Sequence, residues 1–255
     1  MNVGAPALAL SQVDASPEAA TALRFRVEDW AACRMLGAAE AEWLGPSAGS
    51  AVPALPTALR RRVSAIGQKA FQAAWRLPVS DDARFIFCSR HGEYARTASL
   101  LEALAAAEPT SPADFSLSVH HALAGLLSIA RANGAGHSTV AAGPDSFGFG
   151  LFEAAACLAA GSERQVLLVY FDEPLPADYA ALCDEKDGFA AAFLLGPGRR
   201  DDRDIVLSCS PPETRLPQRS ATNQARDFAE FLRSGECERQ SRGGRVQWRW
   251  SHGRS

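Results

Sequence analysis

The chain shows a recurring pattern of short apolar runs, which polar or glycine-containing turns separate. Residues 84–88, Arg-Phe-Ile-Phe-Cys, lie between two aspartates and Ser89, a pattern typical of a buried parallel strand. Further strands are predicted at residues 138–142, 165–170, 189–195 and 205–210. Because these runs alternate with helical stretches, the pattern predicts an α/β fold in which helices cover a sheet.

Helical periodicity fills most of the intervals between the strands. In residues 55–75 apolar side chains recur at steps of three and four, and Pro56 suits a first turn. Ser111 begins a stretch that resembles a helix cap. Residues 25–44 carry tryptophans among small residues and predict a short helix and a loop. Other helices are predicted at residues 97–107, 119–130, 146–161 and 224–232, the last of them ended by Gly235.

The chain divides into a body and two flanking segments. Residues 1–24 form a lead-in that contains alanine, proline and serine, with residues 5–10 as a candidate edge strand. Residues 25–210 carry the strand and helix alternation, and residues 211–255 carry a helix and a strand-like tail at 245–250. We therefore expect one α/β domain with a lead-in and a short C-terminal extension.

Composition narrows the class of protein. The chain has 255 residues, 47% of them hydrophobic, which is ample for one globular core. Its net charge of −3 comes from interspersed charges without a basic stripe, so nucleic acid is not an expected partner. The six cysteines show no CxxC spacing, so neither a metal nor a disulfide is expected. Without a leader or an apolar run near ~18 residues, we expect no membrane contact and a cytoplasmic location.

The stretch from Gly136 to Gly150 combines a short strand, a Gly-Pro turn and a helix that begins near Ser146. Backbone N–H groups at a helix start are unpaired, and the helix dipole is positive there. Such a corner suits a thiolate nucleophile and a developing oxyanion. The local pattern is therefore that of a condensing enzyme.

Residues 118–130, followed after a short loop by Gly136-His137-Ser138, resemble the segment before the active-site cysteine of β-ketoacyl synthases of the thiolase fold. In this resemblance Asp145 stands where the nucleophilic cysteine is expected. Residues 187–195 are similar to the glycine turn and buried strand that close the first half of that fold. The resemblance covers residues 25–210 and implies one half of a thiolase-like ketosynthase fold. The second half of that fold, which carries two catalytic histidines, is expected to be absent. The C-terminal tail is expected to lie outside the resemblance.

A ketosynthase-like chain without the cysteine is similar to chain-length factors, the non-catalytic partner subunits, of a short type found with aryl polyene and related pigment synthesis. The resemblance implies that the chain forms a heterodimer with a complete β-ketoacyl synthase. It also implies that acyl carrier protein binds through that complex and that the chain needs no cofactor. In the family the strand before the nucleophile pairs with the second subunit, so proline at Val140 is expected to prevent pairing. The expected interface residues are Ser138, Thr139, Val140, Ala141, Ala142, Phe147 and Phe149.

Asp145 allows two interpretations. Its carboxylate could shape or polarise an acyl cavity shared with the partner. Alternatively it caps the helix that begins at Ser146, a role worth ~1 kcal/mol, and we favour this second interpretation. An ionised aspartate cannot form the acyl thioester and would repel charge that develops at an oxyanion site. Both interpretations predict a chain without condensing activity.

Two functions of other classes stay open. One is a diverged acyl-transferring or decarboxylating enzyme that acts on carrier-protein substrates through Asp145 or a histidine, although no convincing set of acids and bases accompanies it. The other is a purely structural subunit. A serine hydrolase is not expected, because the residues around Ser146 do not form the GxSxG elbow.

The remaining reactive side chains have plainer interpretations. Cys88 in a strand and Cys157 in a helix are expected to be small buried apolar residues. His120 and His121 are adjacent on a predicted helix and therefore point apart, unlike a metal-binding pair. His91, in a polar loop after a strand, is the better functional candidate, although a turn-stabilising role is expected.

Three consecutive arginines, residues 60–62, lie on the predicted helix of residues 55–75. They could contact an acidic carrier protein, but solvation of an exposed helix face is the favoured interpretation.

Overall fold

The computed structural model describes residues 22–36, 41–52, 54–183, 185–212 and 223–253. The candidate edge strand at residues 5–10 lies outside these described residues. No helix in the described ranges is long and apolar enough to cross a membrane.

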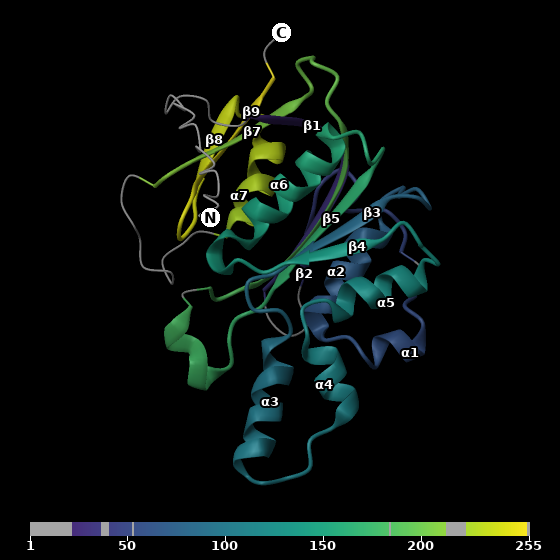
Figure 1. Ribbon diagram of the computed structural model, residues 1–255, viewed down its shortest axis with the longest axis vertical. Coiled ribbons are helices and arrows are strands. Elements are labelled where there is room, and N and C mark those ends of the chain that lie inside the picture. Colours follow the sequence, from purple (N-terminus) through teal and green to yellow (C-terminus); the bar gives the residue numbers. More distant parts are fainter. Residues whose placement is uncertain (1–21, 37–40, 53, 184, 213–222, 254–255) are drawn as a thin grey trace, which may run out of the picture.

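The described strands form one nine-stranded sheet in the order β4-β3-β5-β6-β1-β7-β9-β8, with β2 paired to β1 (Figure 1). Strands β4, β3 and β5 run parallel, whereas the pairings from β5 to β8 along this order are antiparallel. The strands are β1 (Leu23–Met35), β2 (Ala41–Leu44), β3 (Arg84–Cys88), β4 (His137–Val140), β5 (Val166–Asp172), β6 (Gly188–Pro197), β7 (Ile205–Ser210), β8 (Glu238–Arg242) and β9 (Gln247–His252).

Helices cover both faces of this sheet, as the sequence pattern predicted. Alternate residues of β3 and β5 pack on opposite sides, because successive side chains of a strand point to opposite faces. One face packs against α6 and α7, and the other packs against α2 and α5. The helices are α1 (Thr57–Arg60), α2 (Ala65–Trp75), α3 (Tyr94–Ala105), α4 (Pro112–Ser118), α5 (Ala122–Ala130), α6 (Ser146–Ala159) and α7 (Gln224–Ser234).

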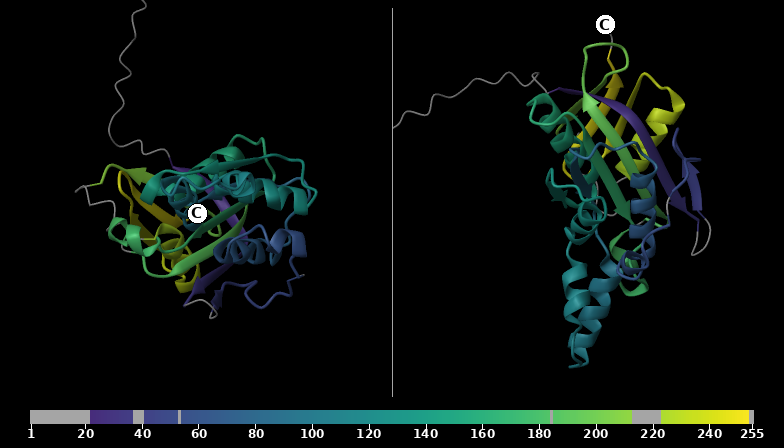
Figure 2. Two further views of the ribbon diagram at one scale, coloured as in Figure 1. Left: turned by 90° about the horizontal axis from the view of Figure 1, so that it is seen from below. Right: turned by 90° about the vertical axis from the view of Figure 1, so that its right-hand side faces the viewer.

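The helices α3 and α4 project together from one end of the sheet (Figures 1 and 2). Ser111 caps α4, since its Oγ accepts a hydrogen bond from the Asp114 backbone N at 3.2 Å, which confirms the predicted helix start. The described ranges also contain two short 3-10 helices, η1 (Gly143–Asp145) and η2 (Ala177–Leu182).

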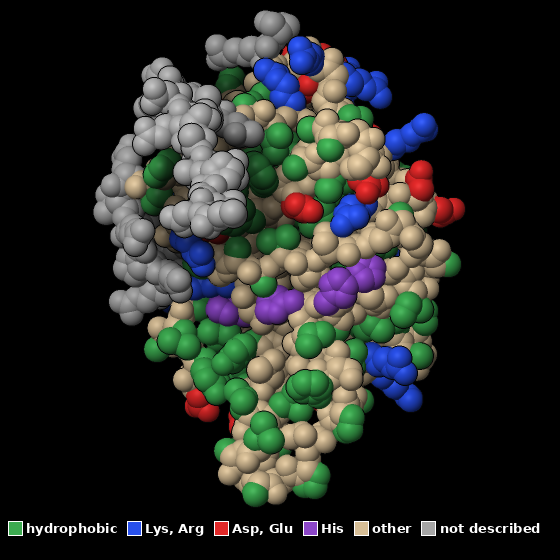
Figure 3. Space-filling model, in the orientation of Figure 1, with side chains coloured by type: hydrophobic (Ala, Val, Ile, Leu, Met, Phe, Trp, Pro, Cys, Tyr) green, Lys and Arg blue, Asp and Glu red, His purple; other side chains and the backbone are tan. Residues whose placement is uncertain are grey.

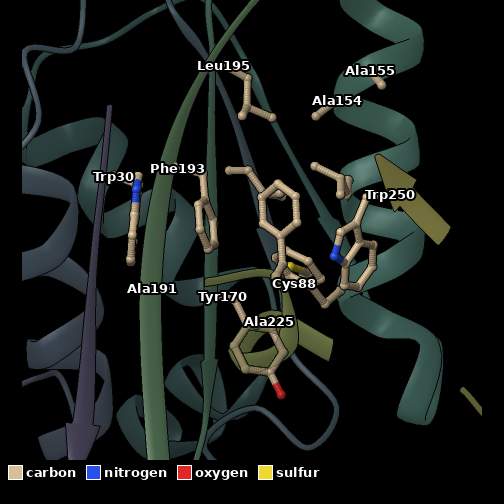
Figure 4. Packing of buried hydrophobic residues seen from close by; sticks show 14 of the residues in the cluster. Trp30, Cys88, Ala154, Ala155, Tyr170, Ala191, Phe193, Leu195, Ala225 and Trp250 are labelled. Atoms are coloured by element: carbon tan, nitrogen blue, oxygen red, sulfur yellow. The ribbon is translucent and has the colours of Figure 1, made fainter. Parts of the chain in front are cut away.

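The face under α6 and α7 holds an aromatic core, part of which Figure 4 shows. Phe147 at the start of α6 lies 5.6 Å from Phe193 of β6 and 5.6 Å from Phe228 of α7 between ring centroids. Phe228 also meets Trp250 of β9 edge to face at 5.4 Å. The core therefore ties α6 and the middle of the sheet to the C-terminal elements.

The helix and loop predicted for residues 25–44 are wrong, because this region forms β1 and β2. In β1, charged residues alternate with Phe25 and Val27, and a register shift between Val27 and Asp29 then interrupts the period of two. The following residues, Ala31 to Cys33, are buried without alternation, since the strand is covered on both faces. Small residues and the bulge concealed a long central strand.

The single helix predicted for residues 55–75 is also wrong. The chain forms α1 and α2, because Ser64 begins a new helix by accepting a hydrogen bond from the Gly67 backbone N at 3.2 Å. The arginines at 60–62 lie at this break and are exposed. Likewise His120 and His121 lie in the turn between α4 and α5 and not on a helix.

The C-terminal segment contains the predicted helix α7, which ends at Gly235 in a left-handed conformation, and the predicted strand β9. It also contains β8, which the sequence did not predict because Glu238 to Arg242 is entirely polar. Trp248 and Trp250 of β9 are fully buried, so this segment belongs to the sheet and to its core. The division of the chain at residues 24 and 210 stays a prediction.

Candidate functional site

The predicted strand, turn and helix start at residues 137–146 is confirmed: β4 leads through η1 directly into α6. Gly143 adopts a φ of +62°, a conformation that favours glycine and lets the chain reverse. Ser146 fixes the turn, since its Oγ accepts from the Ala142 backbone N at 2.9 Å and donates to the Gly143 carbonyl at 2.7 Å. These hydrogen bonds therefore fix the backbone at the corner, and with it the position of the residue 145 side chain.

Asp145 is fully buried at this corner but does not cap α6, so the favoured interpretation of its role is wrong. Its Oδ2 accepts hydrogen bonds from the backbone N–H groups of Gly244 at 3.1 Å and Arg245 at 2.9 Å. Its Oδ1 accepts from Trp248 Nε1 at 3.2 Å and from Gln224 Nε2 at 3.2 Å. The carboxylate thus holds the turn between β8 and β9 and the start of α7.

Gln224 performs the capping that was expected of Asp145. Its side-chain Oε1 accepts a hydrogen bond from the Gly148 backbone N at 2.9 Å, in the first turn of α6. Its Nε2 donates to Asp145, so one amide joins the helix start to the carboxylate. Because Gln224 is 2% exposed, both bonds are shielded from water, which strengthens them.

Two glycines permit this close contact. A Cβ on Gly243 would lie 1.4 Å from Asp145 Oδ1, and a Cβ on Gly148 would lie 2.1 Å from the indole of Trp248. The C-terminal hairpin therefore occupies the space above position 145. The cavity beside it, lined in part by Pro144 and Tyr170, has a volume of about 20 Å³, room for roughly one water molecule.

Cys88 and Cys157, the two cysteines considered from the sequence, do not supply a thiolate at this corner. Cys88 is fully buried in β3, and burial raises the pKa of its thiol well above the usual value. Burial, and then the charge of Glu153, raise the pKa of Cys157, whose Sγ lies 3.9 Å from the Glu153 Oε1. Both thiols are protonated at neutral pH and are poor nucleophiles, as the sequence predicted, although Cys157 is half-buried and not buried as expected.

His91 lies in the loop after β3, which a buried carboxylate organises. Asp172, at the end of β5, accepts hydrogen bonds from Ser89 Oγ at 3.0 Å and from the backbone N–H groups of Arg90 and His91 at 2.6 and 2.9 Å. Burial raises the pKa of Asp172 to about 6 and lowers that of His91 to about 4. The imidazole is therefore neutral at pH 7. The loop is held through the backbone N–H of His91, and the buried Nε2 of the ring has no hydrogen-bond partner, so the turn-stabilising role expected of the side chain is not confirmed.

The expected interface strand β4 occupies one end of the sheet, with β3 on one side. Ser138, Thr139 and Val140 are half-buried, and Ala141 is exposed. Phe149 is 37% exposed and packs edge to face on Trp248, with centroids 5.1 Å apart. These residues, together with the half-buried Ala142, stay a predicted interface.

Phe147 is only 1% exposed and lies in the aromatic core, so its assignment to the interface is wrong. The helix start turns its ring inward, toward Tyr170 of β5 at a centroid distance of 5.9 Å. Its role is to hold α6 on the sheet.

The hydrogen bonds of β4 also correct the expectation for Val140. The carbonyls of Gly136 and Val140 accept from β3, from the backbone N of Phe85 at 3.2 Å and of Ser89 at 3.3 Å. In a parallel pair the N–H and C=O of one residue point to the same side, and this side alternates along the strand. The backbone groups of Val140 therefore face β3, whereas those of His137 and Thr139 face the open edge.

Histidine side chains form a band across the face seen in Figure 3. His121 lies 4.4 Å from His137 between ring centroids, and its Nδ1 lies 3.1 Å from Thr139 Oγ1. His120 packs against Gly92 in the loop after β3. The two neighbouring histidines thus point to different partners, as expected, and the described residues contain no group of three metal-ligating side chains.

The model of the β-ketoacyl synthase N-terminal domain matches residues 28–251 of the chain. The chain belongs to this family. The match takes in α7, β8 and β9, which the sequence had placed outside the ketosynthase resemblance. None of the curated proteins matches the chain.

Solved structures of ketosynthases share the fold. A chain of the complex of the ketosynthase ApeO with its chain length factor ApeC from Xenorhabdus doucetiae is 28% identical, with a TM-score of 0.73 over 90% of this chain and 100% of that chain. A chain of the ishigamide ketosynthase/chain length factor is 13% identical, with a TM-score of 0.54 over 74% and 67%. A β-ketoacyl synthase from Burkholderia phymatum is 14% identical, with a TM-score of 0.55 over 84% and 71%.

Sequence reasoning missed the residues that surround Asp145. Gln224 and Trp248 lie 79 and 103 residues from it along the chain, and no local pattern links them. The pair Gly243-Gly244 between two short polar and aromatic segments was the one available sign of a hairpin turn.

Proposed function

We propose that this ketosynthase-like chain is a non-catalytic subunit, a chain-length factor or stabilising partner, that pairs with a complete β-ketoacyl-ACP synthase. The pathway we propose is aryl polyene or related polyketide and fatty-acid-like synthesis. The observation that carries this proposal is the burial of Asp145 under the C-terminal hairpin, at the position that the sequence resemblance assigns to the nucleophile.

The chemistry of position 145 argues against condensation by this chain. A carboxylate cannot hold the growing chain as a thioester, and its charge would oppose an oxyanion at the same helix start. Its four hydrogen-bond donors all come from the chain itself, and they occupy the approach that an acyl group would need. The same contacts disfavour the alternative of a diverged acyl-transferring or decarboxylating enzyme that uses Asp145.

The open edge of β4 supports a partner subunit. Backbone N–H and C=O groups at His137 and Thr139 face away from β3, and an unpaired edge strand is a ready template for another chain. The structure that is 28% identical is a complex of a ketosynthase with its chain length factor, which supports the same arrangement here. In this proposal acyl carrier protein is reached through the complex, and the cytoplasmic location stays a prediction.

Co-expression with the ketosynthase of the same pathway tests the proposal. We expect the two chains to co-purify as a heterodimer, and the isolated chain to show no acyl adduct by intact mass after incubation with acyl carrier protein. Thr139→Pro, which removes an outward N–H group, should weaken pairing at least tenfold. Asp202→Ala, at an exposed position between β6 and β7 and away from β4, is the control and should co-purify like the parent. A monomeric chain that recovers no ketosynthase would contradict the proposal.

A further inference from the structure

A cleft of about 520 Å³ lies between the projecting pair α3 and α4 and the start of α2. It is separate from the corner at Asp145, and its walls are of two kinds. One part is apolar, formed by Ala95, Leu100, Ala103 and Pro109. The other part carries charged groups and hydroxyls, formed by Ser64, Glu93, Arg96, Ser99, Thr110, Ser111, Asp114 and Glu173.

Glu93 is the most buried charged residue of this cleft, at 5% exposure. Its Oε1 accepts a hydrogen bond from the Ser64 backbone N at 2.8 Å. Its Oε2 is buried and has no hydrogen-bond partner, although Arg96 Nε lies 3.4 Å away. A buried carboxylate oxygen without a donor is costly, so this atom has capacity for a ligand.

Arg96 does not neutralise the cleft. Its Nη1 lies 2.5 Å from Asp114 Oδ1, and its Nη2 donates to the Arg62 carbonyl at 3.0 Å. One guanidinium therefore faces three carboxyl groups of the lining, those of Glu93, Asp114 and Glu173. The lining therefore has a formal charge of −1 when Glu173 is protonated and −2 when Glu173 is ionised.

Glu173 follows β5 and faces Glu93. Burial first, and then the charges of Glu93 and Asp172, raise the pKa of its carboxyl to about 7. Both of the charges that act on it are negative, so the site favours either a proton or a cation. Its side chain also lines the small cavity beside Asp145 and a further hollow of about 270 Å³, which places it at the meeting point of three spaces.

We propose that this cleft binds a small organic cation, a primary alkylammonium, with its nitrogen between Glu93 and Glu173 and its alkyl chain along the apolar wall. An ammonium group brings three N–H donors, which can supply the free Oε2 of Glu93 and the carboxyl of Glu173 together. Leu100 and Ala103 of α3 form an apolar surface against which the alkyl chain of the ligand would pack. A fatty-acid carboxylate would meet like charge, and a neutral acyl chain would leave Oε2 without a donor.

Calorimetric titration of the full chain with three probes of equal length tests this proposal. We expect n-hexylamine to bind measurably at pH 8, hexanol to bind at least tenfold more weakly, and hexanoate not to bind. Affinity for hexylamine should fall about tenfold from pH 8 to pH 6, because Glu173 takes up a proton while the amine, like a lysine, stays charged.

Two variants and a control locate the site. Glu173→Gln should weaken the binding of hexylamine at pH 8 at least tenfold and remove the pH dependence of that binding. Glu93→Gln should also weaken the binding of hexylamine, while the amide oxygen of the new glutamine still accepts the hydrogen bond from the Ser64 backbone N. Glu102→Gln, on an exposed position of α3 outside the cleft, should change nothing. Equal binding of the three probes, tighter binding of hexanoate, or unchanged hexylamine affinity in Glu173→Gln would each overturn the proposal. None of these outcomes bears on pairing with a ketosynthase, which the co-purification tests.

Discussion

The indole of Trp248 donates a hydrogen bond from Nε1 to Oδ1 of Asp145 at 3.2 Å, across a sequence separation of 103 residues. Asp145, which the sequence resemblance predicted to stand in place of a nucleophile, is therefore a structural anchor. It connects the start of α6 with β9, and hence the corner at β4 with the far strands of the sheet.

Replacement of this anchor should destabilise the fold. In Asp145→Ala, the N–H groups of Gly244, Arg245 and Trp248 lose their acceptor in a buried site, and we expect the free energy of unfolding to fall by about 3 kcal/mol. Urea denaturation measures this change. Asp82→Ala, at an exposed position before β3, is the control and should stay within about 0.5 kcal/mol of the parent. Equal stability of the two variants would show that the anchor is dispensable.

Adjacent glycines offer a sharper comparison. A Cβ on Gly243 would lie 1.4 Å from Asp145 Oδ1, whereas a Cβ on Gly244 would lie 3.5 Å from its nearest neighbour, Pro144 Cγ. We expect Gly243→Ala to lower stability by about 2 kcal/mol or more, because the hairpin must move away from the carboxylate. Gly244→Ala should have a small effect, and thermal unfolding of both variants checks the difference.

Restoring a cysteine should not restore condensation. In Asp145→Cys the thiol would stand at the helix start, yet Gly243 and Trp248 would still cover it. We expect slow alkylation by iodoacetamide and no elongated product with acyl and malonyl carrier protein, both measured by mass spectrometry. Turnover by the purified variant alone would refute the assignment of this chain as a non-catalytic subunit.

His91 should make stability depend on pH. Burial, and then Arg90 and His120, lower its pKa from 6.5 to about 4 in the folded chain. Between these values the unfolded chain binds a proton that the folded chain does not, so stability falls as the pH falls from 6.5 to 4. With allowance for partial exposure of the ring, the contribution is about 1 kcal/mol.

The variant His91→Gln keeps the backbone N–H group that donates to Asp172. It should lose the contribution of His91 to the dependence of the free energy of unfolding on pH. Urea denaturation of both proteins at pH 6.5 and at pH 5 measures it. The groups Asp172 and Glu173, whose pKa values are raised, contribute a slope of the opposite sign, which the comparison of the two proteins cancels. An unchanged slope in the variant would exclude His91 as its source.

The sequence predicted the parts of the fold that local pattern determines. β3 and β5 are continuous apolar runs, and α6 follows a Gly-Pro turn, so each carries its own signal. In β1 the signal was hidden, because a bulge shifts the alternation and a stretch of small buried residues follows it. β8 is polar and forms through its pairing with β9, which no local periodicity reports.

At the candidate site, the sequence located the corner but misassigned two side chains, and the assignment of position 145 to the nucleophile stays a prediction. Asp145 was expected to cap α6 because an aspartate before a helix usually does so. The bonds from the C-terminal hairpin override that preference, and Gln224 caps the helix from a distant segment. Phe147 was expected at the surface because the residues that bury its ring are distant in sequence. The aromatic core around this ring includes α7, which begins 77 residues further along the chain.

The distance between Asp145 and Trp248 along the chain also bears on the order of events during synthesis. A ribosome adds roughly 5–20 residues per second. Several seconds therefore pass between the synthesis of Asp145 and that of Trp248 in β9, which donates a hydrogen bond to its carboxylate. Until residues 224–234 have been made, α6 has neither its glutamine cap nor the cover of α7, and part of its aromatic face is open. The nascent chain thus completes this core only after residues 224–250 have been made, which makes their docking the step that closes the aromatic side of the sheet.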